Sequence, residues 1–395
     1  MAERKLKNWM ESFLQWTLQS EAPDSFLRFA GYFALSSALR RHVKVGNEYL
    51  GGWECYPNLY ICYVGPAGVV KKSTSIGKAE ELLENLTQLQ MLTGSATTPI
   101  IIKKLQDSPE SSLTISIDEL GVLVEKAGPT IYSILIRLFD GKKRIEDETI
   151  MRGLILAENP SCNFFAGTTP EWISENFSTG VLGGGFGSRT LFIHESEPRH
   201  FRLIHKGHNT NINFAKLKDD LISDLTYISE SIKGDFHMDK ETYEWFDRWY
   251  VQSVENPNVN ERKIKGYIQR RPAYVMKIAM LEKIAVSDEL ILTIPDLENS
   301  IKVLKNIEHK IANTFRAVGR NKYVPDMDGI EAFIRDSGKI EQSQLFSEFN
   351  AVAEPAMLKQ LIEALILMDR IQLSMDTTTH KNYFSIIPKK LQAIK

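Results

Sequence analysis

The sequence predicts an α/β fold with a parallel sheet at its centre. Four short runs have the length and composition of strands, at residues 59–64, 112–117, 162–167 and 190–194. The first three end in glycine, acidic or hydroxyl residues and lead toward stretches with helical character. Strands that alternate with helices are typical of parallel sheets.

The composition is that of a globular protein with ample core. At 395 residues the chain exceeds one ordinary domain, so we expect two or three. It is 43% hydrophobic and 25% charged, and its net charge of −2 argues against a wholly basic nucleic-acid coat. The three cysteines lack metal-ligand spacing, and we see neither a membrane span nor a signal peptide. We therefore expect a cytoplasmic protein, in the host cell if viral, with no membrane partner.

The central motif is GPAGVVKKST at residues 65–74, between the first strand and a helical stretch. Backbone N–H groups at a glycine-bearing turn and a helix start can hold phosphates. A lysine neutralises their charge and a hydroxyl binds Mg²⁺. The candidate nucleotide-binding residues are Gly65, Gly68, Lys71, Lys72, Ser73 and Thr74, and Ser73 is also a candidate Mg²⁺ ligand.

The motif fits the pattern G-x-x-x-x-G-K-[ST] in two registers. Counted strictly from Gly65, Val70 takes the second glycine position and Lys71 the lysine position. With one extra loop residue, Lys72 and Ser73 form the lysine–hydroxyl pair, and Lys71 stands where glycine is expected. We prefer the second register because it places a lysine beside a hydroxyl. A plain strand–turn–helix with a basic turn is the alternative.

Two later strands end in candidate catalytic residues. The run SLTISIDEL at residues 112–120 ends in Asp118, which would orient Mg²⁺ through water, and Glu119, which would polarise the attacking water. A polar helix cap is the alternative. The run CNFFAGTTP at residues 162–170 contains Thr168 and Thr169. Either could contact the γ-phosphate or the attacking water, or cap the following helix.

Three arginines are candidates for sensing phosphate. Arg189 is the first charge after a glycine-rich loop and could act as an arginine finger in trans from a neighbouring subunit. An ion pair at a strand start is the alternative. Arg270 and Arg271 lie in the most basic stretch, residues 262–272. One of them could be a second phosphate sensor, both could line a nucleic-acid channel, or they could lie on a solvated face.

Two other segments predict local structure. Residues 43–58 predict a short hairpin turning near Gly51 and Gly52, in which Trp53 is a core or rim aromatic rather than a base-stacking one. Residues 142–148 predict a projecting loop or hairpin. This charge run is either a solvated surface or a contact to a neighbour or nucleic acid.

The chain divides into four predicted parts. We expect an N-terminal helical segment at residues 1–45, the nucleotide-binding core at 46–205, an α-helical domain at 206–320 and a winged-helix-like domain at 325–395. The last part has three helical patterns followed by two β-like runs. Its recognition-helix candidate, residues 355–368, has few positive charges nearby, so protein docking is as well supported as DNA binding.

Several motifs together resemble a family of phage and mobile-element proteins. These proteins are mainly known as a domain of unknown function, and they look like primase-associated helicases with a RecA-like or AAA-like P-loop ATPase core. The resemblance covers most of residues 25–315 and is carried by PNLYICYVGPAG, KKSTSIG, LTISIDELG, NPSCNFFAGTTPE, GGGFGSRTLFI and RRPAYVMKIA. It implies Lys72 and Ser73 as phosphate and Mg²⁺ residues, Asp118 and Glu119 as the acidic pair, and Arg189 as the finger. The segment at residues 70–72 departs from the family pattern.

We therefore expect a homo-oligomeric ATPase, for example a hexameric ring, with ATP and Mg²⁺ as cofactors. It would be a helicase-like replication protein that moves along or remodels DNA, more specifically single-stranded DNA. A replication partner would bind its C-terminal domain. The alternative is a nucleotide-binding scaffold or helicase/primase loader with weak or no hydrolysis. A packaging motor is a third possibility, but we find no nuclease carboxylate cluster.

Overall fold

The computed structural model describes residues 3–46, 50–149, 153–177, 181, 185–202, 212–255, 265–314, 324–349, 354–377 and 380–387. The chain forms two compact units, Met1–Val318 and Gly319–Lys395. The first three predicted parts lie in the first unit, and the winged-helix-like part lies in the second. Among the described helices, none is both long and apolar enough to cross a membrane.

The first unit is built on a five-stranded parallel sheet with the order β3-β4-β7-β2-β8. Its strands are β2 (Tyr60–Val64), β3 (Met91–Leu92), β4 (Ser112–Ile117), β7 (Ser161–Thr168) and β8 (Leu191–His194). Every residue of β2, β4 and β7 is buried, because helices cover both faces of the sheet. The predicted α/β class with a parallel sheet is confirmed.

The strand order places three strand ends side by side. β2 comes first along the chain, yet it lies between β7 and β8, which come last. β7 in turn separates β2 from β4. The carboxyl ends of β2, β7 and β4 therefore lie next to one another at one edge of the sheet. In open α/β sheets, ligands bind at this edge, where the strand order reverses.

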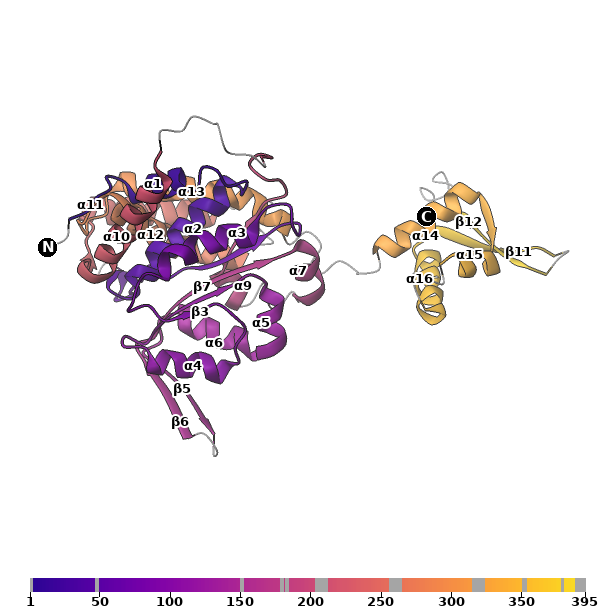
Figure 1. The fold of residues 1–395 in the computed structure, drawn as a ribbon. Coiled ribbons are helices and arrows are strands. Elements are labelled where there is room, and N and C mark those ends of the chain that lie inside the picture. The colour runs from indigo at the N-terminus through magenta and orange to yellow at the C-terminus, as the bar shows by residue number, and fades with distance from the viewer. Residues whose placement is uncertain are drawn as a thin grey trace. The chain divides into compact units, whose positions relative to one another are not determined.

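Helices form a layer on each side of the sheet (Figure 1). One layer contains α2 (Asp24–Leu39) and α3 (Lys72–Leu83), with α1 (Trp9–Trp16) and α10 (Phe214–Ser231) packed outside them. The other contains α4 (Thr98–Asp107), α5 (Leu120–Ala127), α6 (Thr130–Phe139) and the short helix α9 (Gly185–Arg189). Helix α7 (Pro170–Asn176) follows β7 directly. The predicted N-terminal helical segment contains α1 and α2.

The predicted helical part after residue 206 contributes three long helices beside α10. These are α11 (Lys240–Glu255), α12 (Lys265–Val286) and α13 (Ile294–Thr314). Helix α12 packs against α2, α9 and α13, and α13 packs along β8. The helices therefore belong to the same compact unit as the sheet.

The predicted hairpin at residues 43–58 is only partly correct. Val45 and Cys55 form an antiparallel bridge across Gly51 and Gly52, which have φ values of +63° and +78°. However, β1 (Val43–Val45) takes its main partner from far along the chain and pairs in parallel with β9 (Gly234–Phe236). Such a partner gives no local signal in the sequence.

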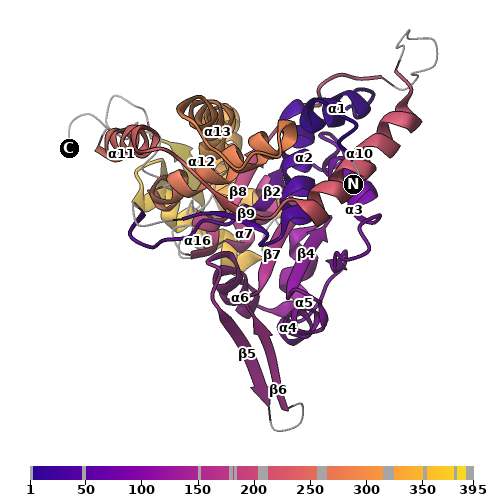
Figure 2. The ribbon, with the colours of Figure 1, turned by 90° about the vertical axis from the view of Figure 1, so that its left-hand side faces the viewer.

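The predicted projecting segment is a two-stranded antiparallel hairpin. It consists of β5 (Arg144–Thr149) and β6 (Gly153–Glu158), and it extends away from the sheet in Figures 1 and 2. Ile145 and Ala157 are fully buried near its base, where the hairpin packs against α4.

The second unit has three helices and a three-stranded antiparallel sheet. Its elements are α14 (Val324–Ser337), β10 (Lys339–Glu341), α15 (Gln342–Glu348), α16 (Pro355–Leu367), β11 (Ile371–Met375) and β12 (Asn382–Ile386). β12 lies between β10 and β11. Met327, Ile334 and Leu358 belong to its separate hydrophobic core. The three helices and two strands predicted here are present, and β10 is an additional strand.

Candidate functional site

The loop between β2 and α3 depends on glycine at two positions. A Cβ at residue 65 would collide with the carbonyl oxygen of Glu195 and lie 2.6 Å from Val70 Cγ2. Gly65 N–H also donates to the Thr168 carbonyl oxygen at 3.3 Å, which joins the loop to the end of β7. Gly68 has φ +73°, a conformation that favours glycine. Both predicted loop glycines therefore have a backbone role.

Lys71 occupies the conformation expected of a third glycine. It is the N-cap residue of α3, with φ +53° and ψ +43° in the left-handed region. For a residue with a side chain this conformation costs about 1 kcal/mol. Lys71 Nζ lies 3.2 Å from Glu21 Oε2. This is the geometry that the second register expects, with Lys71 at the glycine position and Lys72 as the first helical residue.

Lys72 closes the loop from the inside. Its Nζ donates to the carbonyl oxygens of Gly65, at 2.6 Å, and Pro66, at 3.4 Å. The residue is only 9% exposed, and burial lowers the pKa of its ammonium group, while the charge of Glu119 opposes that shift. Lys72 is therefore a buried cation directed at the centre of the loop, at the N-terminus of a helix.

Glu119 follows β4 and faces the same centre. Burial raises the pKa of its carboxyl group, and three neighbours oppose that rise: the Lys72 charge, the Thr168 hydroxyl and the Gly121 N–H. Glu119 and Lys72 are thus near enough for their charges to interact, although 47 positions separate them in the sequence. A carboxylate whose pKa is raised by burial is a better general base than an exposed one.

The two threonines at the end of β7 have different roles. Thr169 is the N-cap of α7, where its side chain accepts a hydrogen bond from the Trp172 N–H at 3.2 Å. Thr168 is fully buried as the last residue of β7 and interacts with Glu119. The structure therefore places Thr168 in the candidate site, as predicted, and gives Thr169 the capping role.

The candidate Mg²⁺ ligands lie at the open side of this site. Ser73 and Thr74, in the first turn of α3, and Asp118, just after β4, are all exposed. The described residues hold no group of three or more His, Cys, Asp or Glu side chains placed to bind a metal ion. One hydroxyl and one carboxylate still fit Mg²⁺, which commonly takes its remaining ligands from water and substrate phosphates.

Sequence reasoning missed Glu80, which lies further along α3. Burial raises the pKa of its carboxyl group, the neighbouring Ser116 hydroxyl opposes this, and the charge of Asp118 raises it further. Its signal in the sequence is an acidic residue next to the sheet-facing Ala79. Glu80 adds negative charge behind Asp118.

Two pockets border the loop. The first, of about 550 Å³, is lined by Lys71 and Thr74 on one side and by residues of the α1–α2 connection on the other. The second, of about 680 Å³, includes Glu195, whose backbone N–H donates to the Val64 carbonyl oxygen at 3.0 Å. Each volume is in the range of small-molecule sites.

Arg189 and Arg270 lie at the opposite edge of the sheet. Arg189 is two residues before β8 begins, and it bonds Asp140 with two nitrogens, Nε at 2.8 Å and Nη2. Arg270 Nη1 lies 3.3 Å from the same carboxylate. Within one chain, Arg189 therefore forms an ion pair at the start of a strand, as the alternative interpretation of this residue predicts. Neither arginine joins the cluster around Lys72 and Glu119.

Arg271 is held among the long helices. It forms an ion pair with Glu308 on α13, and its guanidinium carbon lies 5.8 Å from the centre of the Trp249 ring. Only 7% of Arg271 is exposed, so in this conformation it is neither a solvated surface charge nor a contact for the loop.

The sequence has no match among protein-family models, and no curated protein matches it. Any inference about function therefore rests on the geometry of the site.

Proposed function

We propose that this chain is a P-loop ATPase that binds ATP with Mg²⁺ and couples hydrolysis to movement along, or remodelling of, single-stranded DNA. The observation that carries the proposal is the proximity of Lys72 and Glu119, whose charges interact, beyond the carboxyl ends of β2 and β4, the two strands on either side of β7. There they flank a glycine-dependent loop and a helix N-terminus. A cation for phosphate and a base for water would thus occupy one site.

The loop supplies the groups for phosphate binding. Lys72 would exchange its two carbonyl partners for phosphate oxygens, which are stronger acceptors because they are charged. Backbone N–H groups at the start of α3 would hold the remaining oxygens. The pocket lined by Lys71 and Thr74 has room for the nucleoside.

Three residues would prepare the reaction. Ser73 and Asp118 would hold Mg²⁺, Asp118 through water, and the metal would screen the phosphate charge. Glu119 would orient a water molecule and accept its proton, with Thr168 fixing the position of the Glu119 carboxylate. These roles use only side chains that the structure brings to one sheet edge.

Arg189 would act in trans. Because it lies at the sheet edge opposite its own loop, it would reach the γ-phosphate only of a neighbouring subunit in a homo-oligomer such as a hexameric ring. Asp140, which holds it now, would have to share or release it. Arg270 shares that carboxylate and would belong to the same surface.

A second candidate function is a nucleotide-binding scaffold or loader that hydrolyses ATP slowly. It is favoured by the C-terminal unit, which we propose to be winged-helix-like. Leu367 is 86% exposed, and the nearby Arg370 is paired with Asp328 and Glu331. An exposed leucine and a neutralised arginine suit a replication-protein partner better than DNA. Either protein would work in the cytoplasm, in the host cell if the chain is viral.

The test is steady-state ATP hydrolysis by the whole protein with Mg²⁺, with and without single-stranded DNA. The motor predicts turnover that DNA stimulates and that Glu119→Gln lowers by about 10²–10⁴-fold, the usual contribution of a general base. Glu125→Gln, an exposed glutamate on α5, is the matched control and should leave turnover unchanged. Background turnover with intact ATP binding would reject the motor in favour of the scaffold.

A further inference from the structure

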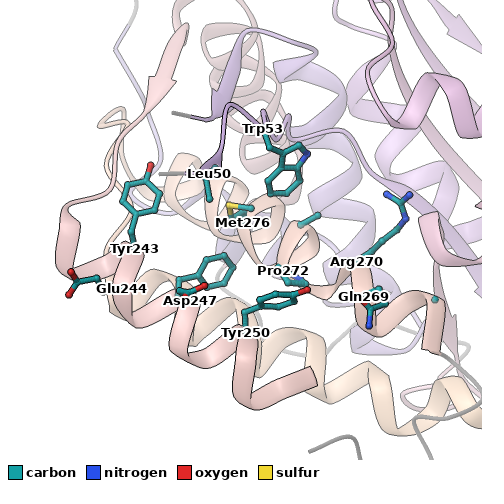
Figure 3. Close-up of a pocket in the computed structure, with 13 residues that line it drawn as sticks. Leu50, Trp53, Tyr243, Glu244, Asp247, Tyr250, Gln269, Arg270, Pro272 and Met276 are labelled. Carbon is teal, nitrogen blue, oxygen red and sulfur yellow. The ribbon is translucent and has the colours of Figure 1, made fainter. Parts of the chain in front are cut away.

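A pocket of about 700 Å³ opens between α11, α12 and the segment that follows β1. Four of its thirteen lining residues are aromatic, and Figure 3 shows the rings of Trp53 and Tyr250 on different elements around it. Phe246 and Met276 contribute further apolar surface. The volume is that of a ligand site, and aromatic walls with a few polar groups are typical of such sites.

Trp53 is the most exposed of the aromatic residues in the pocket, with 46% of its surface accessible. Large aromatic residues normally bury most of their surface, and an exposed one beside a pocket is a common feature of binding sites. Its indole offers a flat apolar face to a planar ligand. The expected core or rim role for Trp53 therefore describes only part of its surroundings.

The pocket also has a charged end. Arg270 lines it, and Figure 3 shows this side chain on the opposite side from Glu244. Asp140 is shared between Arg270 and Arg189, so these three side chains carry a net positive charge. Burial and the nearby charge of Arg189 both lower the pKa of Arg270, which indicates a cation that Asp140 does not fully compensate. An anion would complete this group.

A flat aromatic face and an incompletely compensated cation in one pocket define the chemistry of a nucleotide. We propose that this pocket binds one nucleotide unit of single-stranded DNA, with the base stacked on Trp53 and a backbone phosphate on Arg270. The carboxylates of Glu244 and Asp247 would repel phosphate and so fix the base end toward α11. The choice of DNA rests on the proposed function, but the pocket does not depend on the phosphate loop.

The pocket and the phosphate loop are separate sites. Lys277, one turn of α12 beyond Ala273 in the pocket, binds the carbonyl oxygens of Tyr56 and Asn58, just before β2 begins. The phosphate loop starts where β2 ends. Five strand residues span roughly 15 Å, so a ligand in one site would not touch the other.

The test is binding of a fluorescently labelled oligodeoxythymidylate to the whole protein, followed by anisotropy without ATP. Trp53→Ala should weaken binding by about tenfold, the usual loss for one stacked base. Arg270→Gln should weaken it and reduce the dependence on salt by about one phosphate contact, and Arg270→Lys should restore part of both. Lys103→Gln, an exposed cation on α4, is the control for charge alone and should bind like the original protein.

Two further measurements separate the possible outcomes. The oligonucleotide should quench tryptophan fluorescence in the original protein but not in Trp53→Phe, whereas thymidine monophosphate should not quench it at the same concentration. Equal DNA binding by Trp53→Ala and the original protein would overturn the inference. Quenching by the mononucleotide alone would also overturn it and assign the pocket to a free nucleotide. Trp53-dependent DNA binding in a protein without ATP turnover would reject only the motor.

Discussion

The carboxyl and amino edges of the central sheet both carry cationic and acidic side chains. The two edges differ in how far these charges are paired within the protein. At the carboxyl edge, Lys72 is bound to two backbone carbonyls among the described residues, and the nearby acids Asp118 and Glu119 retain access to water. At the amino edge, Arg189 and Arg270 are already held by Asp140. The carboxyl edge therefore offers its charges to a ligand, whereas the amino edge uses most of its charges internally.

The difference has a physical cause. A parallel sheet ends in loops and helix N-termini at its carboxyl edge, which attract anions, while helices return to its amino edge with their carbonyl ends. Asp140 follows the end of α6, and Lys277 is surrounded by carbonyl oxygens before β2. At the amino edge, cations therefore stabilise the fold, although Arg270 keeps some charge available to a ligand, and at the carboxyl edge Lys72 is available to phosphate. Substitutions at each edge should separate function from stability.

The largest expected effect is on ligand binding at the carboxyl edge. Lys72→Ala should weaken ATP binding about 100-fold, near 3 kcal/mol, because a charged hydrogen bond to phosphate is lost. The melting temperature should also fall somewhat, because the buried Gly65 carbonyl oxygen loses its donor. Fluorescent ATP analogue titration measures the first effect, with Lys126→Ala on α5 as the control. Unchanged affinity would remove Lys72 from the site.

At the amino edge, the expected effect is on stability. Asp140→Asn should destabilise the protein by about 2 kcal/mol, because two partly buried guanidinium groups would then face each other without a carboxylate. Asp107→Asn, which breaks an exposed pair with Lys103, should change stability by less than about 0.5 kcal/mol. Urea unfolding curves compare the two. Equal losses would mean that Asp140 does not hold this edge.

Local patterns predicted the strands but could not predict their neighbours. The run at residues 59–64 is found as β2 because a fully buried strand is apolar throughout. Asp118 and Glu119 were found because they directly follow a strand. By contrast, the β1–β9 pairing and the position of β2 between β7 and β8 depend on residues far apart in the sequence.

The same distinction holds for single side chains. The interaction of Glu80 with Ser116 and the pairing of Arg189 with Asp140 each join separate elements. The spacing of residues within one segment does not specify such a contact. Glu80 was therefore not identified from the sequence, and two interpretations of Arg189 remained open. The structure assigns Arg189 a partner within the chain, and its role toward a second subunit stays a prediction.

The pH dependence of stability tests the role of Lys277 at the amino edge. Its ammonium group is only 3% exposed and bonds the carbonyl oxygens of Tyr56 and Asn58 and the Asn58 side chain. Burial lowers its pKa from 10.5 to about 8. The folded state therefore binds fewer protons than the unfolded state between these values, and stability should rise with pH across that window. Below about pH 8 the burial of charge costs its full amount, roughly 3 kcal/mol.

Lys277→Met removes this titration but also leaves carbonyl oxygens without their donor. Melting temperatures of both proteins from pH 7 to pH 10 isolate the effect, because only the original protein should gain stability relative to the variant as pH rises. Parallel pH profiles would mean that Lys277 does not lose its proton in the folded state more readily than in the unfolded chain.

The prediction with the smallest expected effect tests whether Lys71 or Lys72 is the phosphate-binding lysine of the loop. Lys71 adopts a left-handed conformation, so Lys71→Gly should be more stable than Lys71→Ala by about 1 kcal/mol, since both lose the Glu21 contact but only alanine keeps the strain. If Lys72 is the phosphate lysine, Lys71→Gly should also bind ATP within a few-fold of the original protein. A loss as large as that of Lys72→Ala would instead place the phosphate contact on Lys71, and the loop would follow the strict register. The carboxyl edge would then use the half-buried Lys71 for the ligand and the buried Lys72 to hold the loop, as the amino edge uses its own buried cations to hold the fold.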